Sequence, residues 1–208
     1  MKTRRMYRTI LAIVIAFGAL VAATPNISQA TSVAAADPGD PSGPFCGSIP
    51  AEGEGSFEGM ADDPAATAAS NNPFLTTLAS AVQAAGLVDT LNGPGPFTIF
   101  APSNEAFAAV PQAELDAILA DNEVLTSILT YHVVAGASLS VAELAAAGTV
   151  TSVQGGELRF TLDEGGALII NGGEAVATCS NISTANATVH VVDRVLTPPL
   201  PEDCFVRC

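Results

Sequence analysis

Hydrophobic residues at helical spacing mark the first half of the chain. Phe74, Leu78 and Val82 recur every four residues, which is the pattern of an amphipathic helix. Similar spacing predicts short helices around residues 103–107, 111–119, 124–129 and 140–147. The last of these begins with a Ser-x-x-Glu capping box at residues 140–143, so its start is well defined by sequence.

The second half of the chain changes to a period of two residues. Between residues 158 and 163, hydrophobic side chains alternate with polar ones, as in a strand with one buried face. Turns rich in glycine and asparagine or aspartate come next, at 163–166 and 171–173. Strands are predicted over residues 97–100, 158–163, 167–170, 175–179 and 187–196. Helices followed by an antiparallel meander indicate an α+β domain.

The N-terminus has the pattern of an export signal. Residues 1–8 are basic, and residues 10–23 form an uninterrupted apolar run. A membrane span needs about 20 apolar residues, whereas the core of a signal peptide needs about 7–15. We therefore predict a signal peptide over residues 1–30, with cleavage between Ala30 and Ala36, and no membrane span in the mature protein. A retained N-terminal anchor is the alternative.

Composition divides the remainder of the chain into three parts. Residues 31–56 alternate proline with glycine, which opposes both helix and strand and predicts a flexible tail rich in proline, glycine and alanine. The periodic patterns begin near Phe57, so we expect one folded domain over residues 57–199. Residues 200–208 form a C-terminal tail that carries two cysteines.

The charge is unevenly distributed. The chain has 7 Lys+Arg and 21 Asp+Glu, a net charge of −14, but four of the basic residues lie within the first eight positions. From residue 31 onward three arginines face all 21 acidic residues, which gives −18. Such a surface repels phosphate backbones and anionic lipid, so we expect no nucleic-acid partner. No acidic calcium loop occurs, and no metal is predicted.

The four cysteines fit an oxidising compartment. They can pair in three ways. Cys204 and Cys208 are close enough in sequence for a local bridge, which leaves Cys46 with Cys179. A zinc site is the competing interpretation, but the chain has only two histidines and no Cys-x-x-Cys motif, which disfavours it.

Three segments can be recognised together, in this order: residues 97–107 (FTIFAPSNEAF), 131–134 (YHVV) and 189–199 (VHVVDRVLTPP). In order and spacing they resemble the signatures of the fasciclin-like domain, also called FAS1. The match covers roughly residues 57–199. More narrowly, residues 70–73 and 127–134 resemble the secreted mycobacterial immunogenic antigens of this family.

The resemblance implies a compact antiparallel β-sandwich wedge flanked by several short helices. It also implies a secreted, extracellular module for binding or cell adhesion, which can be associated with the cell envelope. The partner of such a module is a protein, a glycan or a lipid. We expect a monomer. The resembling antigens bond a tail cysteine to one near the position of Cys179, which supports the pair Cys46–Cys179. No Arg-Gly-Asp or Asp-Ile sequence occurs, so an integrin-type receptor role is in doubt.

His132 follows an apolar helical stripe, which predicts a buried histidine hydrogen-bonded to the first or last signature. Ser103, Asn104 and Asp193 are the candidate neighbours, and together the four would form a structural polar network. A pH switch is the sharper alternative. Tyr131 is expected in the core with its hydroxyl on a polar partner. Because the Tyr-His dipeptide is implicated in adhesion in the resembling family, Tyr131 and His132 are also candidates for partner contact.

Catalysis is not predicted, and no cofactor is expected. Ser103, His132 and Asp193 could be drawn as a hydrolase triad, but Gly-x-Ser-x-Gly is absent. The chain also has no tryptophan and few other aromatics to build a sugar-cleaving site. The alternative to an adhesion module is a carrier or sensor of a small lipid or glycan. A sizeable apolar cavity would favour the carrier, and a flat exposed patch would favour a protein partner.

Overall fold

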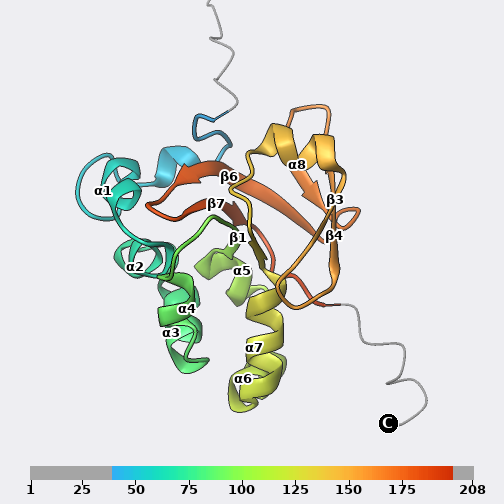
Figure 1. Cartoon of the computed structure of the whole chain (residues 1–208). Coiled ribbons are helices and arrows are strands. Elements are labelled where there is room, and N and C mark those ends of the chain that lie inside the picture. The colour runs from blue at the N-terminus through green and yellow to red at the C-terminus, as the bar shows by residue number, and fades with distance from the viewer. Residues whose placement is uncertain (1–38, 199–208) are drawn as a thin grey trace, which may run out of the picture. The chain divides into compact units, whose positions relative to one another are not determined.

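The computed structural model describes residues 39–198 (Figure 1). The predicted signal peptide, the first part of the predicted tail, and the C-terminal pair Cys204 and Cys208 lie outside the described residues. The domain boundaries inferred from composition therefore stay predictions.

Short helices and a seven-stranded sheet make up the described part of the chain. The helices are η1 (Cys46–Ser48), α1 (Phe57–Asp62), α2 (Ala65–Asn71), α3 (Thr76–Ala84), α4 (Val88–Leu91), α5 (Asn104–Ala108), α6 (Gln112–Ala120), α7 (Asn122–Tyr131) and α8 (Val141–Ala147). The strands are β1 (Phe97–Pro102), β2 (Val133–Ala135), β3 (Thr149–Thr151), β4 (Glu157–Leu162), β5 (Leu168–Ile170), β6 (Ala175–Ser183) and β7 (Ala187–Val192). The predicted α+β class is confirmed.

The sheet is mixed, with the strand order β2-β1-β7-β6-β5-β4-β3. Strands β4 to β7 form the antiparallel meander that the alternating pattern predicts, and β3, which was not predicted, extends it by pairing antiparallel to β4. The exception to an antiparallel sheet is β1, which pairs parallel to β7 with Phe100 opposite His190. Strand β1 comes from the helical half of the chain, so only the tertiary fold determines which strand it joins.

The last two strands differ in length from the prediction. Strand β7 ends at Val192 and not at Leu196, because the Asp193 side chain turns back to accept a hydrogen bond from the Val176 amide at 2.7 Å. Strand β6 continues to Ser183 instead of stopping at Cys179. Its register against β7 shifts twice, and local periodicity cannot anticipate such bulges.

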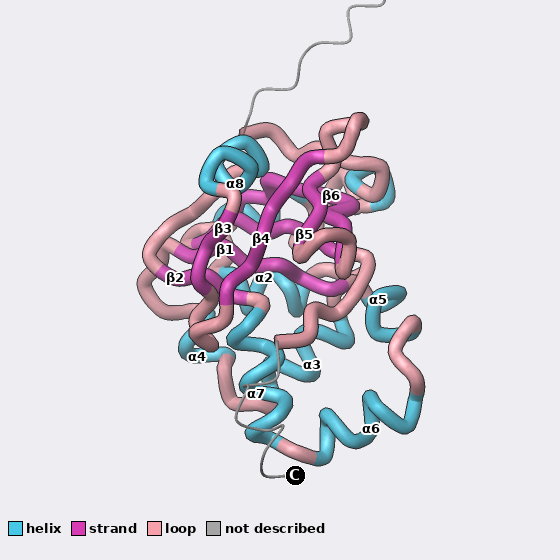
Figure 2. Tube along the Cα trace, turned by 90° about the vertical axis from the view of Figure 1, so that its right-hand side faces the viewer, coloured by secondary structure: helices cyan, strands magenta, loops and turns pink. Residues whose placement is uncertain are grey.

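Two hydrophobic cores lie on opposite faces of the central strands. Along β1, Ile99 and Ala101 belong to one core, whereas Phe100 belongs to the other, because successive strand residues point to opposite faces. The first core is filled mainly by helices α1 to α3 and α7. The second contains Leu144 of α8 and residues of β4 to β6. In both views α8 lies apart from α3, α6 and α7 (Figures 1 and 2).

Helix ends agree closely with the sequence signals. Ser140 and Glu143 form the predicted capping box of α8, and Gly148 ends that helix with a φ of 68°. Ser103 caps α5, and its side chain accepts from the Ala106 amide. The amphipathic pattern around 111–119 does form a helix, but α6 has no buried residue, and Leu119 is 45% exposed. This helix lies at the edge of the helical layer (Figure 2).

The described part of the predicted flexible tail is held against the domain. A disulfide joins Cys46 to Cys179, as predicted, with 4.9 Å between the Cα atoms. The Phe45 amide donates to the Thr178 carbonyl at 3.0 Å, and the Phe45 ring meets that of Phe74 edge-on at 5.0 Å. This stretch is nearly free of regular structure, as its proline and glycine content suggests. Its attachment depends on long-range contacts that composition does not reveal.

Candidate functional site

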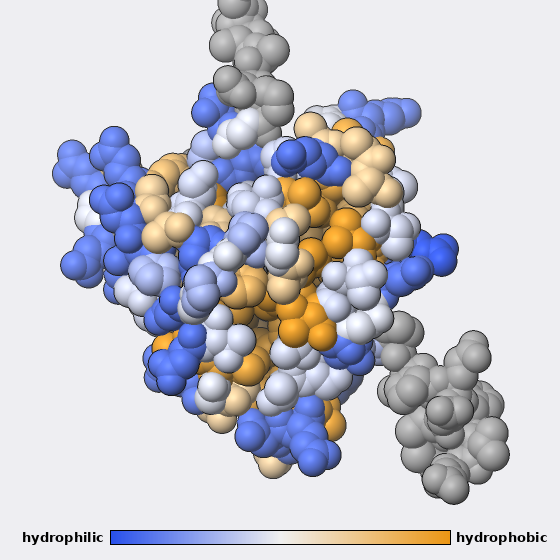
Figure 3. Space-filling view, in the orientation of Figure 1, coloured by the Kyte–Doolittle hydropathy of each residue, from blue (hydrophilic) through white to orange (hydrophobic). Residues whose placement is uncertain are grey.

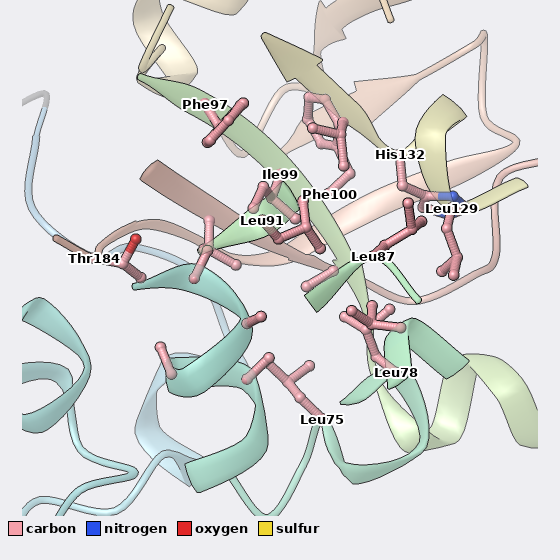
Figure 4. Close-up of a pocket in the computed structure, with 18 of the residues that line it drawn as sticks. Leu75, Leu78, Leu87, Leu91, Phe97, Ile99, Phe100, Leu129, His132 and Thr184 are labelled. Carbon is pink, nitrogen blue, oxygen red and sulfur yellow. The ribbon is translucent and has the colours of Figure 1, made fainter. Parts of the chain in front are cut away.

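An apolar cavity of about 220 Å³ lies between the helices and the sheet. Helices α2, α3 and α4 form one wall, and strands β1, β2 and β7 with the end of α7 form the other. In Figure 4, Leu75, Leu78 and Leu91 reach from the helical side toward Ile99 on β1. Voids in protein cores are seldom much larger than a water molecule, so a space of this size needs an explanation.

Small side chains on the helical wall account for the space. Helix α2 presents Ala65, Ala66 and Ala68 to the cavity, and α3 adds Ala79. All four are buried, but a methyl group cannot reach across to the sheet as a leucine or phenylalanine would. Alanine counts as hydrophobic in the sequence pattern, yet here it leaves the core unfilled.

Three polar residues of the cavity wall, Thr130, Thr184 and His132, have partners within the protein. The Thr130 hydroxyl donates to the Thr126 carbonyl at 2.7 Å, and the Thr184 hydroxyl donates to the Ala187 carbonyl at 3.0 Å. His132 also lines the cavity, with both ring nitrogens hydrogen-bonded to backbone. The interior therefore suits hydrocarbon. An apolar cavity of about 150 Å³ stays dry and can bind benzene, so this one is large enough for a small apolar molecule.

The cavity opens between two helical segments. In Figure 3, hydrophobic side chains gather in a hollow in the middle of the face, between the region of α3 and α4 and that of α7. Leu87 and Phe97 are half-buried where they line the cavity, and Val153 is 48% exposed. These residues form an apolar rim through which a ligand could enter.

His132 is buried in a fixed tautomer. The Leu196 amide donates to Nε2 at 2.9 Å, so this nitrogen carries the lone pair and the Nδ1–H group donates to the Ile128 carbonyl at 2.7 Å. Burial lowers the pKa of His132 to about 4. The prediction of a buried histidine bonded to the first or last signature is thus confirmed for the last one, but the partner is a backbone amide and not the side chain of Ser103, Asn104 or Asp193.

The other members of the predicted polar network act separately. Ser103 Oγ accepts from the Ala106 amide, and Asp193 binds β6 as described above. Asn104 Oδ1 accepts from the Thr77 amide at 3.0 Å and links α5 to α3. Within residues 39–198, no hydrogen bond joins His132 to the side chain of Ser103, Asn104 or Asp193. The triad that can be drawn on the sequence therefore does not assemble.

Tyr131 belongs to a different polar cluster that the sequence did not reveal. Its hydroxyl donates to the Glu157 carbonyl and accepts from Asn171 Nδ2, both at 3.0 Å. Asn171 Nδ2 also donates to Glu174, which in turn accepts from the Thr197 amide at 2.7 Å. The pKa of Tyr131 is raised, mainly because its side chain is buried. In the sequence, Asn171 is recognisable as part of an Asn-Gly turn. That pattern predicts a turn, but it does not indicate that Asn171 binds Tyr131.

A second histidine, His190, is also buried, and this was not predicted from the sequence. The His190 ring stacks on Phe100 with 5.6 Å between centroids, and its Nε2–H group donates to the Leu139 carbonyl at 2.9 Å. Burial lowers the pKa of His190 to about 4 as well. Tyr131, His132 and His190 are at most 2% exposed. Direct contact of Tyr131 and His132 with a partner therefore stays a prediction that their burial does not support.

A membrane-spanning helix and a cluster of metal ligands are both absent from residues 39–198. Within this range no helix is long and apolar enough to cross a membrane. Nor do three or more histidine, cysteine, aspartate or glutamate side chains of this range come together as metal ligands could.

Comparison with known proteins connects this chain to a family. The model of the Fasciclin domain matches residues 73–198. The cell surface glycolipoprotein MPB83 of Mycobacterium bovis is 44% identical over 187 residues, covering 85% of this chain and 81% of that protein. The immunogenic protein MPB70 of the same species is 45% identical over 169 residues, covering 77% and 84%. Protein sll1483 of Synechocystis is 37% identical over 134 residues, covering 64% and 72%.

A solved structure is similar in fold. It is a FAS1 domain pair from the insect cell adhesion molecule fasciclin I, with a TM-score of 0.55 and 18% sequence identity. The match covers 70% of this chain and 53% of that chain, which holds two domains. The likeness shows the fold alone. The cell-surface relatives confirm the predicted extracellular location.

Proposed function

This chain belongs to the fasciclin domain family, and we propose that it is an extracellular, non-enzymatic binding protein that holds a small apolar ligand in the cavity between its helices and its sheet. The cavity is the observation that carries the proposal. Its lining is nearly all hydrocarbon, and its volume of about 220 Å³ corresponds to about nine carbon atoms when scaled from benzene in a 150 Å³ cavity.

The cavity favours a carrier or sensor over an adhesion module. A flat hydrophobic patch would have supported a protein partner, but the large exposed hydrophobic side chains among the described residues lie on different elements: Leu119, Val124, Val153 and Leu162. Adhesion, which the sequence resemblance implies, stays a prediction.

The absence of a catalytic role is also part of the proposal. The relatives are named as cell-surface and immunogenic proteins. In this chain, Ser103 Oγ caps a helix and both His132 nitrogens bind backbone groups. Neither side chain is arranged as a nucleophile with its base.

Binding of straight-chain alcohols of increasing length tests the proposal. Each methylene transferred from water into the cavity contributes about 0.8 kcal/mol, which tightens binding about four-fold. We expect the dissociation constant, measured by isothermal titration calorimetry on the full chain, to fall by this factor per carbon up to about nine carbons and then to level off. An affinity that does not depend on chain length, or a lack of binding for the whole series, would contradict the proposal.

A further inference from the structure

A polar depression adjoins the apolar cavity. It has a volume of about 480 Å³ and is wide open to solvent. Its lining consists of two side-chain amides, three hydroxyl groups and one carboxylate, from Asn122, Gln154, Thr126, Ser127, Thr130 and Glu123. We call these six residues the polar trough. Thr130 lines both the trough and the cavity, so the two spaces are neighbours on either side of this residue.

Helix α7 supplies most of the trough from one face. Asn122, Thr126 and Thr130 recur at intervals of four residues, so they lie above one another on the helix surface. Leu129, next in sequence to Thr130, points into the cavity instead. One helix therefore presents a polar face to the trough and an apolar residue to the cavity.

The loop after β3 lies along the boundary between the two spaces. The Val153 amide donates to the Val133 carbonyl at 2.7 Å, and the Gln154 amide donates to the Thr130 carbonyl at 3.3 Å. These bonds hold Val153 at the cavity and Gln154 at the trough. An apolar wall thus changes to a polar one within two adjacent residues.

The trough is suited to uncharged hydrogen-bonding groups. Gln154 Oε1 accepts from the Gly156 amide at 3.0 Å, and within residues 39–198 its Nε2 group makes no hydrogen bond, so it can donate to a ligand. Thr130 donates its hydroxyl proton to backbone carbonyls and can still accept. Amides and hydroxyls that both donate and accept match the hydroxyl groups of a sugar or of glycerol.

A negatively charged head group would be poorly accommodated. Arg159 and Arg194 are the only basic residues in the described part of the chain, and neither lines the trough. Glu123 does line it, so a ligand carboxylate or phosphate would meet a like charge with no cation to compensate.

We propose that the ligand is an uncharged amphiphile whose alkyl chain occupies the cavity and whose hydroxyl-bearing head group, a glycosyl or glycerol group, lies in the polar trough. This inference rests on the proposed function, because the chain must enter the cavity for its head group to reach the trough. It adds the chemical class of the head group, which the cavity alone does not specify.

Ligands that share one ten-carbon chain and differ in head group test this inference. We would titrate the full chain with decanol, decyl glucoside, glyceryl monodecanoate, decanoate, decyl phosphate and decyltrimethylammonium. Each would be kept below its solubility limit or its critical micelle concentration. We expect the glucoside and the glyceride to bind about ten-fold more tightly than decanol, as one or two net hydrogen bonds would provide. The two anions should bind about ten-fold more weakly than decanol.

The possible outcomes separate the two proposals. If none of the six compounds binds, the proposed function itself fails. If all bind with equal affinity, or if decanoate, the phosphate or the ammonium compound binds most tightly, the cavity is supported and the inference about the head group is overturned.

Variants of the trough make the test specific. Gln154→Leu and Asn122→Leu should each remove most of the preference for decyl glucoside over decanol. Gln83→Leu is the matched control, because Gln83 is exposed on α3 and lines neither space. Because Gln154 also bonds to its own loop, Asn122→Leu keeps the test valid if the first variant does not fold. An unchanged preference for decyl glucoside in folded Asn122→Leu would contradict the inference.

Discussion

Filling the cavity from within the protein should stabilise the fold and block the ligand. Ala79 lies on α3, is 7% exposed and lines the cavity. Ala79→Leu adds three carbon atoms that can enter the space of about 220 Å³. At about 0.8 kcal/mol for each buried methylene, the free energy of unfolding should rise by up to about 2 kcal/mol.

The sign of this change distinguishes a cavity from an ordinary core. In a well-packed interior the same enlargement would force side chains off their rotamers and cost about 1–3 kcal/mol. Urea unfolding followed by circular dichroism measures the difference directly. Ala84→Leu is the matched control, because Ala84 is exposed on the same helix and does not line the cavity. Its effect should stay within about 0.5 kcal/mol.

Ligand binding should change in the opposite direction. A leucine at position 79 takes the place of about three ligand methylenes, so the affinity for decanol should fall roughly fifty-fold. Ala66→Leu, on the neighbouring helix α2, is a second variant of the same kind. Loss of stability in both variants, together with unchanged decanol affinity, would refute the idea that these alanines border a ligand-sized cavity.

Three further predictions concern groups that hold the fold together. The free energy of unfolding should keep its full value above pH 6.5. It should decrease as the pH falls from 6.5 to about 4, by roughly 3 kcal/mol for each of His132 and His190, because the unfolded chain takes up protons that the buried neutral rings do not. Urea unfolding at a series of pH values measures this, and a flat profile between pH 6.5 and 4 would contradict it. His132→Ala should lower stability by about 2–4 kcal/mol, because it leaves the buried Leu196 amide without a partner and removes the ring donor to the Ile128 carbonyl. Unchanged thermal unfolding would show that the ring is dispensable. Replacing both Cys46 and Cys179 by alanine removes a bridge between residues 133 positions apart and should lower the free energy of unfolding by about 2–5 kcal/mol. Equal stability of the oxidised wild type and the double variant would contradict this prediction.

Local patterns were sufficient to predict many of the elements. The period of four residues at Leu78 and Val82 corresponds to α3, although the helix begins at Thr76 and Phe74 precedes it, and the alternation at 158–163 corresponds to β4. Caps were predictable because they depend on residues close in sequence, as the Ser140 capping box shows. The parallel pairing of β1 with β7 was not, because it joins segments about 90 residues apart whose own sequences do not specify the neighbour.

The candidate site could be predicted only in outline. His132 was expected to be buried and bonded to the first or last signature, and it does bind the last one, but its partner is the Leu196 amide. Every residue except proline has such an amide, so no side-chain pattern could identify it. The cavity was beyond prediction because Ala66 and Ala79 look like ordinary core residues in sequence. Only their position opposite β1 shows that they leave a space.

The central claim is that an alkyl chain occupies the cavity, and the most direct test is a nuclear Overhauser measurement on the complex with decyl glucoside. Methyl groups of Leu78, Leu91 and Ile99 lie around the cavity and can be labelled selectively. We expect cross-peaks between the decyl chain and all three residues in the wild type, and their loss in Ala79→Leu. Cross-peaks confined to exposed residues such as Leu119, with none to the three cavity residues, would contradict the claim.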